Sequence, residues 1–423
     1  MKYKSTFILI LLLTFLLVAC LPNPEALTQK RIIAVENGLV SQFSDPFWER
    51  MTLVERMEHY QVPGVSLAVI DDFQIEWARG YGVLAVGGNQ PVTQETLFQA
   101  ASIGKPVVAA AALKLVEQGR LELDRDVNQY LVSWKVPENK FTSEEKVTLR
   151  RLLSHTAGVT VGGFQGYALG QEVPNLLEIL DGKYPANSPP IRVDMVPGTQ
   201  FRYSGGGYMI VQQLLEDVAG DSFPELMEKT VLDPLGMRSS TFASPLPEQF
   251  YEIAASGHRE DGSVIPGGWY TYPEMGSGAS MWTTPSDLAR FAISLMQSYA
   301  GRSDGFLSQE MALKMLSPQT EGRGMDFELG DDGGDLFYFM HPGGNYGYKS
   351  VLVAYPKRGQ GVVIMTNGEK GDLLWREILN SVSIEYGWVK NNTGLYLGIF
   401  VVIVLGILSY LILRARRVKA FKA

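Results

Sequence analysis

Ser102 and Lys105 are a pair whose residue types and spacing indicate catalysis. They lie three apart at the start of a helix predicted over residues 106–118, and residues three apart share one helix face. A serine hydroxyl is a weak nucleophile until a neighbour takes its proton, which a desolvated lysine can do. The flanking residues are apolar, and a helix N-terminus offers N–H groups to a developing oxyanion. The pattern therefore predicts acyl transfer through an activated serine.

The Ser-x-x-Lys spacing alone is a weak signal, because about one match is expected by chance in a chain of this length. A second match runs from Ser143 to Lys146, contains two glutamates and follows Lys140. Its charges favour a solvated helix start with a capping-box pattern, so we interpret it as structural.

Two glycine-rich segments downstream offer partners for the first pair. Tyr203 lies in FRYSGGGY, residues 201–208, and a phenol near cations can relay the serine proton. Taken alone, Tyr203 would be interpreted as a loop tyrosine packed on the core. His341 begins HPGGNYGY, residues 341–348, at the end of a predicted strand. Its imidazole, the glycines and the backbone donors of a strand edge suit pairing with an extended substrate.

The elements that must position these residues follow from the hydrophobic patterns. Strands are predicted over residues 62–70, 75–85, 336–340, 350–355 and 361–367, and helices over residues 106–118, 208–219 and 286–298. The fold class is α/β (α+β), with an antiparallel sheet of about five strands flanked by helices and split by a mostly helical insertion. The boundary between the sheet and the insertion predicts a cleft.

In their order along the chain, these segments resemble the serine beta-lactamase and penicillin-binding protein superfamily. The resemblance is to the class C beta-lactamase-related branch, with its esterases and D-aminopeptidases, and it covers about residues 40–385. It also rests on LLSHTAG at residues 152–158, DPLGM at 233–237 and GSGASMWTTPSDLARF at 276–291. The resemblance implies Ser102 as the acylated nucleophile, Lys105 and Tyr203 as general acid and base, and the backbone N–H groups of Ser102 and Gly344 as an oxyanion hole.

The resemblance also places His341, Gly343 and Gly205 on the substrate side, while His155 belongs to a signature that we interpret as structural. Two departures matter. Gly205 stands where the family usually has an asparagine that touches the lysine and the substrate amide. His341 replaces a lysine that helps to hold a substrate carboxylate, and an imidazole is largely neutral near pH 7.

These departures favour cleavage of an ester or a peptide amide over efficient beta-lactam hydrolysis. A peptide containing D-amino acids or derived from the cell wall would fit. The alternative is a protein that binds penicillin or cell-wall peptide with little or no turnover.

The N-terminus has the pattern of a secretory signal peptide, predicted over residues 1–19. Lys2 and Lys4 precede an apolar run, residues 7–18, whose length as a helix, about 18 Å, is short of the roughly 30 Å bilayer core. The sequence LVAC at residues 17–20 resembles a bacterial lipobox, which predicts lipidation of Cys20. An ordinary signal peptide with a chance cysteine is the alternative.

Near the other end, residues 394–413 predict a transmembrane helix, and the basic residues 414–423 predict a cytoplasmic tail. A buried core helix is the alternative. The predicted organisation is a linker at residues 20–39 and a hydrolase domain at residues 40–390. The domain would lie outside the cytoplasm and be held at the cell membrane.

Composition excludes several other classes. The chain has 37 Lys and Arg against 45 Asp and Glu, a net charge of −8, which argues against nucleic-acid binding. The single cysteine rules out an intrachain disulfide, and the four histidines show no metal-ligand spacing, so neither metal nor other cofactor is expected. Gly104-Lys105 does not form a P-loop, because no glycine stands five residues before Gly104 and Pro106 replaces the Ser or Thr. The partners expected are a small-molecule or peptide substrate and the membrane.

Overall fold

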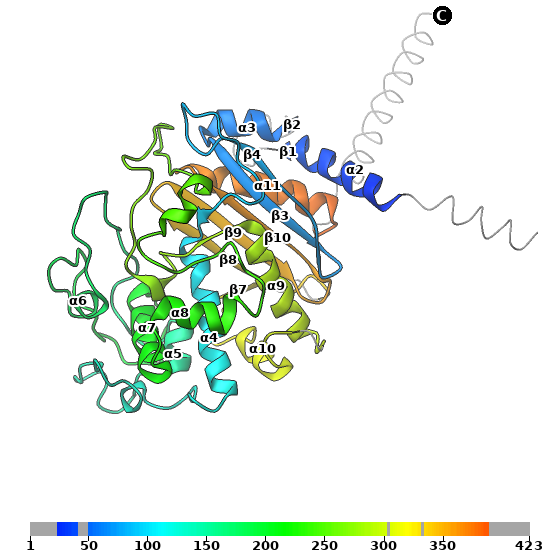
Figure 1. Ribbon diagram of the computed structural model, residues 1–423. Coiled ribbons are helices and arrows are strands. Elements are labelled where there is room, and N and C mark those ends of the chain that lie inside the picture. Colours follow the sequence, from blue (N-terminus) through cyan, green and yellow to red (C-terminus); the bar gives the residue numbers. More distant parts are fainter. Residues whose placement is uncertain (1–22, 41–49, 303–304, 331–333, 389–423) are drawn as a thin grey trace, which may run out of the picture.

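The computed structural model describes residues 23–40, 50–302, 305–330 and 334–388. Its centre is a six-stranded antiparallel sheet with the strand order β4-β3-β10-β9-β8-β7 (Figure 1). The strands are β3 (Gly64–Asp71), β4 (Gln74–Gly82), β7 (Glu328–Gly330), β8 (Tyr338–Asn345), β9 (Tyr348–Tyr355) and β10 (Gln360–Thr366). Because β3 pairs with β10, the two ends of the described domain meet in the middle of the sheet.

The five predicted strands are all present, and the sheet gains β7 as a sixth at its edge. The strand predicted over residues 336–340 continues as β8 through the glycines to Asn345. The chain then turns at residues 346–347 into β9, so the His341 segment is part of a sheet hairpin.

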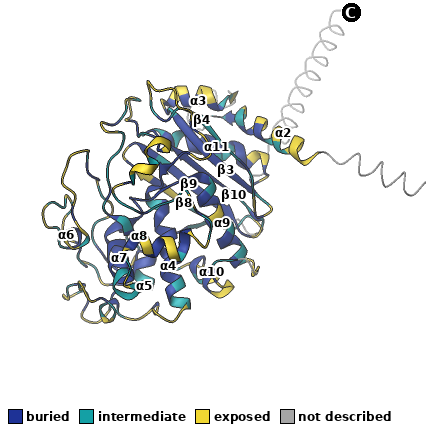
Figure 2. Ribbon diagram, viewed as in Figure 1, coloured by how far each residue is buried: buried dark blue, intermediate teal, exposed yellow. Residues whose placement is uncertain are grey.

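The two faces of the sheet are covered by different helices, because successive side chains of a strand point to opposite faces. On one face Val65, Leu67 and Val69 pack with α11 (Gly371–Glu385), α3 (Leu53–Tyr60) and α2 (Pro24–Glu36). On the other face Ala68 and Ile70 belong to a larger core, which includes α9 (Pro285–Tyr299) and the helices of the insertion. Figure 2 shows β3, β9 and β10 almost entirely as dark blue, buried ribbons between these layers.

The insertion surrounds one buried helix, α4, with further helices, and α9 packs directly on the sheet. α4 (Gly104–Glu117) confirms the helix predicted over residues 106–118, and α7 (Gly205–Ala219) and α9 confirm the two others. The remaining helices of the insertion are α5 (Leu149–Leu153), α6 (Leu176–Asp181), α8 (Phe223–Met227) and α10 (Gln309–Met315). Two pairs of short strands and several 3₁₀ turns complete the fold. The pairs are β1 (Leu39–Val40) with β2 (Arg50–Met51) and β5 (Phe98–Gln99) with β6 (Trp282–Thr283).

Two local predictions are corrected. Residues 24–36, expected within a linker, form helix α2, which is capped by the Asn23 side chain. Ile32 and Val35 are buried, at about 1.5–3 kcal/mol of stabilisation each, and the Ser381 hydroxyl of α11 donates to the Val35 carbonyl oxygen at 3.0 Å. The helix start expected at the second Ser-x-x-Lys match is also wrong. No helix starts at Ser143, and the next helix, α5, begins at Leu149.

The predicted membrane attachments lie outside the described residues. These are the signal peptide at residues 1–19, Cys20, the helix at residues 394–413 and the tail at residues 414–423. Within the described ranges, no helix is both long and apolar enough to span a bilayer.

Candidate active site

Ser102 and Lys105 meet at the start of α4, as their spacing predicts. Strand β5 leads into a 3₁₀ turn, Ala101–Ile103, that continues as α4. The Lys105 Nζ lies 3.0 Å from the Ser102 Oγ, and Lys105 is only 3% exposed. Ala101, directly before the serine, has a left-handed backbone with φ 51°, a conformation that L-residues rarely adopt. The serine therefore sits on a tight, strained turn between a strand and a helix.

Neighbouring segments hold this turn on two sides. The Ala100 N–H donates to the Met281 carbonyl oxygen at 2.8 Å, and the Ser350 hydroxyl of β9 donates to the Ala100 carbonyl oxygen at 3.0 Å. Gly104 packs so closely on Gly278 that a Cβ at position 104 would lie 2.6 Å from the Gly278 Cα. The glycine-rich segment at residues 276–280 thus fixes the nucleophile turn against the sheet.

Tyr203 lies beside this pair. The Lys105 Nζ is 4.9 Å from the centre of the Tyr203 ring, within the range of a cation–π contact. The next residue, Ser204, caps helix α7 through the Gly207 N–H and donates to the Thr160 carbonyl oxygen at 2.8 Å. Capping fixes the start of α7, and with it the place of the tyrosine next to the lysine.

His155 supports the Tyr203 loop. Its Nδ1 accepts the Ser204 N–H at 3.1 Å, so the hydrogen of the neutral ring is on Nε2, which lies 2.5 Å from the Asp326 Oδ1. The His155 and Tyr203 ring centres are 4.5 Å apart. His155 and Asp326 are both buried. His155 therefore positions Tyr203 in this structure, in keeping with the structural role expected for its signature.

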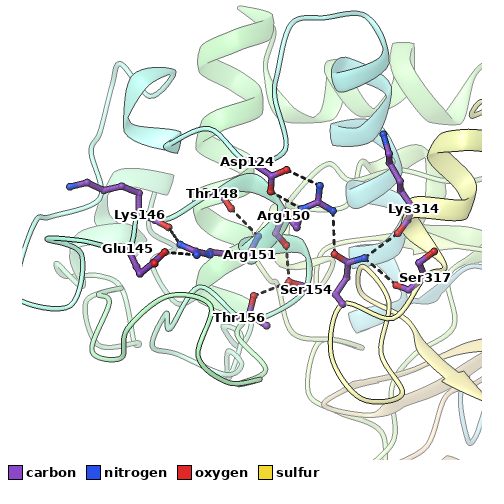
Figure 3. Close-up of polar contacts among 11 residues, drawn as sticks. Asp124, Glu145, Lys146, Thr148, Arg150, Arg151, Ser154, Thr156, Lys314 and Ser317 are labelled. Carbon is purple, nitrogen blue, oxygen red and sulfur yellow. Dashed lines mark hydrogen bonds and ion pairs between the residues drawn. The ribbon is translucent and has the colours of Figure 1, made fainter.

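Polar contacts of α5 and its flanks fix the backbone on both sides of His155. The Ser154 hydroxyl donates to the Arg150 carbonyl oxygen at 2.8 Å and lies 3.0 Å from the Thr156 Oγ1. Arg150 binds both carboxylate oxygens of Asp124, at 2.6 and 2.8 Å (Figure 3). These contacts support His155 in its left-handed conformation, φ 57°.

Asp326 also faces His341 of strand β8. The His341 Nε2 is 3.7 Å from the Asp326 Oδ2, and its Nδ1 lies 2.6 Å from the Pro342 carbonyl oxygen, to which it donates. Burial lowers the pKa of His341, although the Asp326 carboxylate opposes the shift. His341 is therefore neutral near pH 7. One carboxylate thus contacts the histidine that supports the Tyr203 loop and faces the histidine of β8.

Gly343 allows β8 to lie directly against the nucleophile turn. A Cβ there would be 2.2 Å from the Ala100 carbonyl oxygen and 2.3 Å from the Ser350 Oγ. Gly343 and Gly344 both line the cavity above Ser102. Gly205, by contrast, does not line it. Its N–H donates to the Gly162 carbonyl oxygen at 3.0 Å, and a Cβ would lie 3.1 Å from the Phe164 ring.

The residues brought together surround a cavity of about 440 Å³, which we call the reaction cavity. Its lining includes Ser102, Tyr203, His341, Asp326 and Arg323. The Arg323 guanidinium lies 4.3 Å from the Phe201 ring centre and is paired with Glu328 at 3.2 Å. Sequence reasoning missed Asp326 and Arg323, because neither lies in a recognisable motif. Among the described residues no group of three His, Cys, Asp or Glu side chains is placed to hold a metal ion.

Comparisons with known proteins agree with this geometry. The family model described as Beta-lactamase matches residues 50–379. Penicillin-binding protein 4 of Amycolatopsis lactamdurans is 28% identical over 361 residues, which cover 81% of this chain and 91% of that protein. Esterase EstB of Burkholderia gladioli is 30% identical over 244 residues, which cover 55% of this chain and 60% of the esterase.

A solved structure shares the fold. The octameric penicillin-binding protein homologue from Pyrococcus abyssi superposes with a TM-score of 0.60 at 24% identity, covering 79% of this chain and 76% of that chain. At this level of identity the similarity concerns the fold alone.

Proposed function

The chain belongs to the beta-lactamase family of serine hydrolases, and we propose that it cleaves an ester or a peptide amide through an acyl-enzyme on Ser102. The observation that carries the proposal is the 3.0 Å contact between the Lys105 Nζ and the Ser102 Oγ at the reaction cavity. Within the described residues, this serine has a buried amine in reach and open space above it for a substrate.

The proposed reaction has two halves. Lys105, with Tyr203 beside it, takes the proton of Ser102 while the serine oxygen attacks the substrate carbonyl carbon. The N–H groups of Ser102 and Gly344 would hold the resulting oxyanion. As the intermediate collapses, the bond to the leaving group breaks and the leaving group receives the proton from Lys105 or Tyr203. Water then attacks the acyl-enzyme with the same residues acting as base, which frees Ser102.

Two features support an ester or peptide amide over a beta-lactam as the preferred substrate. His341 is a neutral imidazole rather than the lysine ammonium that helps the lactamases to hold a substrate carboxylate. The family asparagine is replaced by Gly205, which lies beneath Phe164. The similarity to an esterase is consistent with this preference. A peptide substrate containing D-amino acids or derived from the cell wall remains part of the proposal.

The second candidate function is penicillin binding with little turnover. It is favoured by the similarity to penicillin-binding protein 4, which extends over 81% of the chain. The two functions share the acylation of Ser102 and differ in how fast water removes the acyl group.

Mass spectrometry of the protein after exposure to a fluorophosphonate, and separately to a penicillin, tests both. We expect an adduct that peptide mapping places on Ser102 and that Ser102→Ala abolishes. Ser143→Ala, in the exposed second Ser-x-x-Lys match, is the matched control and should be labelled like the parent. Decay of the penicillin adduct within minutes indicates turnover, and its persistence indicates binding. A folded protein without either adduct would refute the proposal.

We further propose that the hydrolase domain acts outside the cytoplasm, held at the membrane by a lipid on Cys20 and by a helix at residues 394–413. The support is the sequence pattern of the two ends. Cell fractionation tests it. The parent should sediment with membranes, and a double variant with Cys20→Ser and without residues 390–423 should be released. A double variant that still sediments would contradict this attachment.

A further inference from the structure

A second cavity adjoins the reaction cavity along strand β8. It has a volume of about 410 Å³ and shares Gly344 with the first. The reaction cavity borders β8 at residues 341–344, whereas the second borders the chain at residues 344–346 and continues to Lys349. The two cavities thus follow one another along the strand, with the proposed oxyanion donor Gly344 between them.

The second cavity has aromatic walls, formed by Phe164, Tyr270, Tyr272 and Tyr346. The Tyr270 and Tyr346 rings lie with their centres 5.0 Å apart and tilted by 53°. The buried Tyr272 accepts the Tyr346 N–H on its hydroxyl at 3.2 Å. Such walls favour flat or broad apolar groups, which gain both burial and ring contacts.

The aromatic wall is tied to the nucleophile turn. The Gln99 side chain, three residues before Ser102, donates to the Tyr270 carbonyl oxygen at 2.9 Å. The buried Asn345 side chain donates to the Gln99 Oε1 at 2.7 Å and to the Ala279 carbonyl oxygen at 2.8 Å. A group bound in this cavity therefore has a fixed position relative to the serine.

The charged groups of the second cavity neutralise each other. The Lys349 Nζ lies 2.6 Å from the Glu369 Oε2, and the Glu369 Oε1 accepts the Gly347 N–H at 2.5 Å. A paired lysine and glutamate give no net charge with which to select an ionic group. The aromatic walls are therefore what this cavity offers a ligand.

The chemistry decides which half of the substrate enters the second cavity. A leaving group has to receive a proton from Tyr203 or Lys105, and Tyr203 lines only the reaction cavity. The leaving group therefore lies in the reaction cavity. The substrate carbonyl carbon has three substituents: its oxygen, the leaving group and the rest of the acyl group. The oxygen faces the N–H groups of Ser102 and Gly344, and the leaving group lies in the reaction cavity. The rest of the acyl group therefore extends past Gly344.

We propose that the natural acyl group of this protein carries an aromatic or broad apolar side chain, which the second cavity binds as the acyl subsite. This rests on the proposed function, since it assumes acylation of Ser102. Tyr346 and Tyr270 are the residues that would select the acyl group, because both are partly exposed to the cavity.

Two esters with one leaving group test the assignment: p-nitrophenyl acetate and p-nitrophenyl phenylacetate. The measured quantity is the ratio of kcat/KM for phenylacetate to kcat/KM for acetate, which cancels any general loss of active enzyme. We expect a parent ratio of about ten or more, and a fall of roughly tenfold in Tyr346→Ala and in Tyr270→Ala, the size of one lost aromatic contact. Tyr346→Phe, which keeps the ring, should keep the ratio.

Tyr130→Ala is the matched control, because Tyr130 is also partly exposed but lines neither of these two cavities. Its ratio should equal that of the parent. Acetate turnover with a ratio that neither cavity variant changes would overturn the acyl subsite and leave the proposed function standing. Failure to hydrolyse either ester, together with no fluorophosphonate adduct on Ser102, would overturn the proposed function and this proposal with it.

Discussion

Asp326 lies between the two sides of the reaction cavity. Its carboxylate binds His155, which holds the Tyr203 loop, and faces His341, which belongs to β8. It is buried and has a left-handed backbone, φ 63°. A buried carboxylate in such a place is costly unless it is paired. Its partner is the Nε2 hydrogen of His155, so this hydrogen bond fixes the position of His155.

We expect Asp326→Asn to lower kcat by roughly tenfold to a hundredfold with a much smaller effect on KM. The amide removes the charge that fixes His155, and a displacement of Tyr203 by about 1 Å is enough for a loss of this size. Steady-state ester hydrolysis measures it, and circular dichroism establishes that the variant folds.

Asp287→Asn is the control for Asp326→Asn. Asp287 is equally buried, but it binds Ser239, Ser240 and Arg290 at the start of α9. Asp287→Asn should lower the free energy of unfolding and leave kcat unchanged. An unchanged kcat in folded Asp326→Asn would show that the carboxylate does not position Tyr203.

Gly343→Ala should damage both stability and activity. The added Cβ would lie 2.2 Å from the Ala100 carbonyl oxygen, so β8 must move away from the nucleophile turn. We expect a loss of about 1–3 kcal/mol in the free energy of unfolding, as for other overpacked sites, and slower labelling of Ser102 by fluorophosphonate. A Cβ at Gly334 meets no described atom within 4 Å, so Gly334→Ala should leave both quantities unchanged. Equal labelling rates in the two variants would be evidence against close packing at Gly343.

The sequence predicted those parts of the site that lie in short, recognisable segments. The structure brings Ser102, Lys105, Tyr203 and His341 together around one cavity. The sequence could not predict the role of Asp326, because its position depends on a loop far along the chain that folds back onto the site. The run WYTY at residues 269–272 was a visible aromatic signal for the second cavity, but no local pattern says that it faces β8.

At the scale of elements, prediction succeeded where the hydrophobic period is long. Helices α4 and α9 and the five longer strands lie where their patterns place them. Strand β7 was not predicted, because its three residues are too few to show an alternation of apolar and polar side chains. Helix α2 was missed because only Ile32 and Val35 are buried, too few to show a helical period. Both pack in the core that α11 also lines, and α11 is more than 300 residues away in the sequence.

The ion pair between α3 and α11 gives an element-scale prediction. The Arg56 Nε lies 2.8 Å from the Glu377 Oε2, both side chains are nearly inaccessible, and the Tyr60 hydroxyl donates to the Glu377 Oε1 at 2.6 Å. Glu377→Gln keeps an acceptor for Tyr60 but leaves the Arg56 charge buried without its counter-ion. We expect a loss of about 3–5 kcal/mol in the free energy of unfolding, measured with urea.

Glu385→Gln, at the exposed end of the same helix, should change stability by less than about 0.5 kcal/mol. The molar activity of folded Glu377→Gln should match the parent, since α11 covers the sheet face opposite α4. A stability loss no larger than that of Glu385→Gln would mean that the pair contributes little.

At the scale of the whole molecule, the site depends on the closure of the sheet. Ser102 comes from the start of the insertion, Tyr203 from its middle and His341 from the sheet after it. The sheet itself closes when β3 meets β10, nearly 300 residues later. No part of the described chain holds the reaction cavity by itself, so loss of activity should follow global unfolding.

Global stability should in turn depend on pH through Glu274. Its side chain is fully buried, and within the described part of the chain neither carboxyl oxygen has a hydrogen-bond partner. Burial raises the pKa of this carboxyl from 4.5 to about 8. Between these two values the folded protein keeps the proton and the unfolded chain has released it. The unfolded state therefore binds fewer protons, and stability falls as the pH rises through this window, by up to about 1.4 kcal/mol per pH unit.

We expect Glu274→Gln to remove this contribution, because an amide of the same shape does not ionise. The free energy of unfolding of the variant minus that of the parent should grow by a few kcal/mol between pH 5 and pH 8 and level off above pH 8. Urea unfolding at pH 5, 6.5, 8 and 9 measures it, and only the change with pH counts, because the amide adds a constant term of its own. Glu252→Gln, at an exposed position, should show a constant difference over the same range. A constant difference for Glu274→Gln as well would mean that Glu274 is ionised in the folded protein, and hence that water or a local rearrangement reaches the carboxyl and relieves its burial.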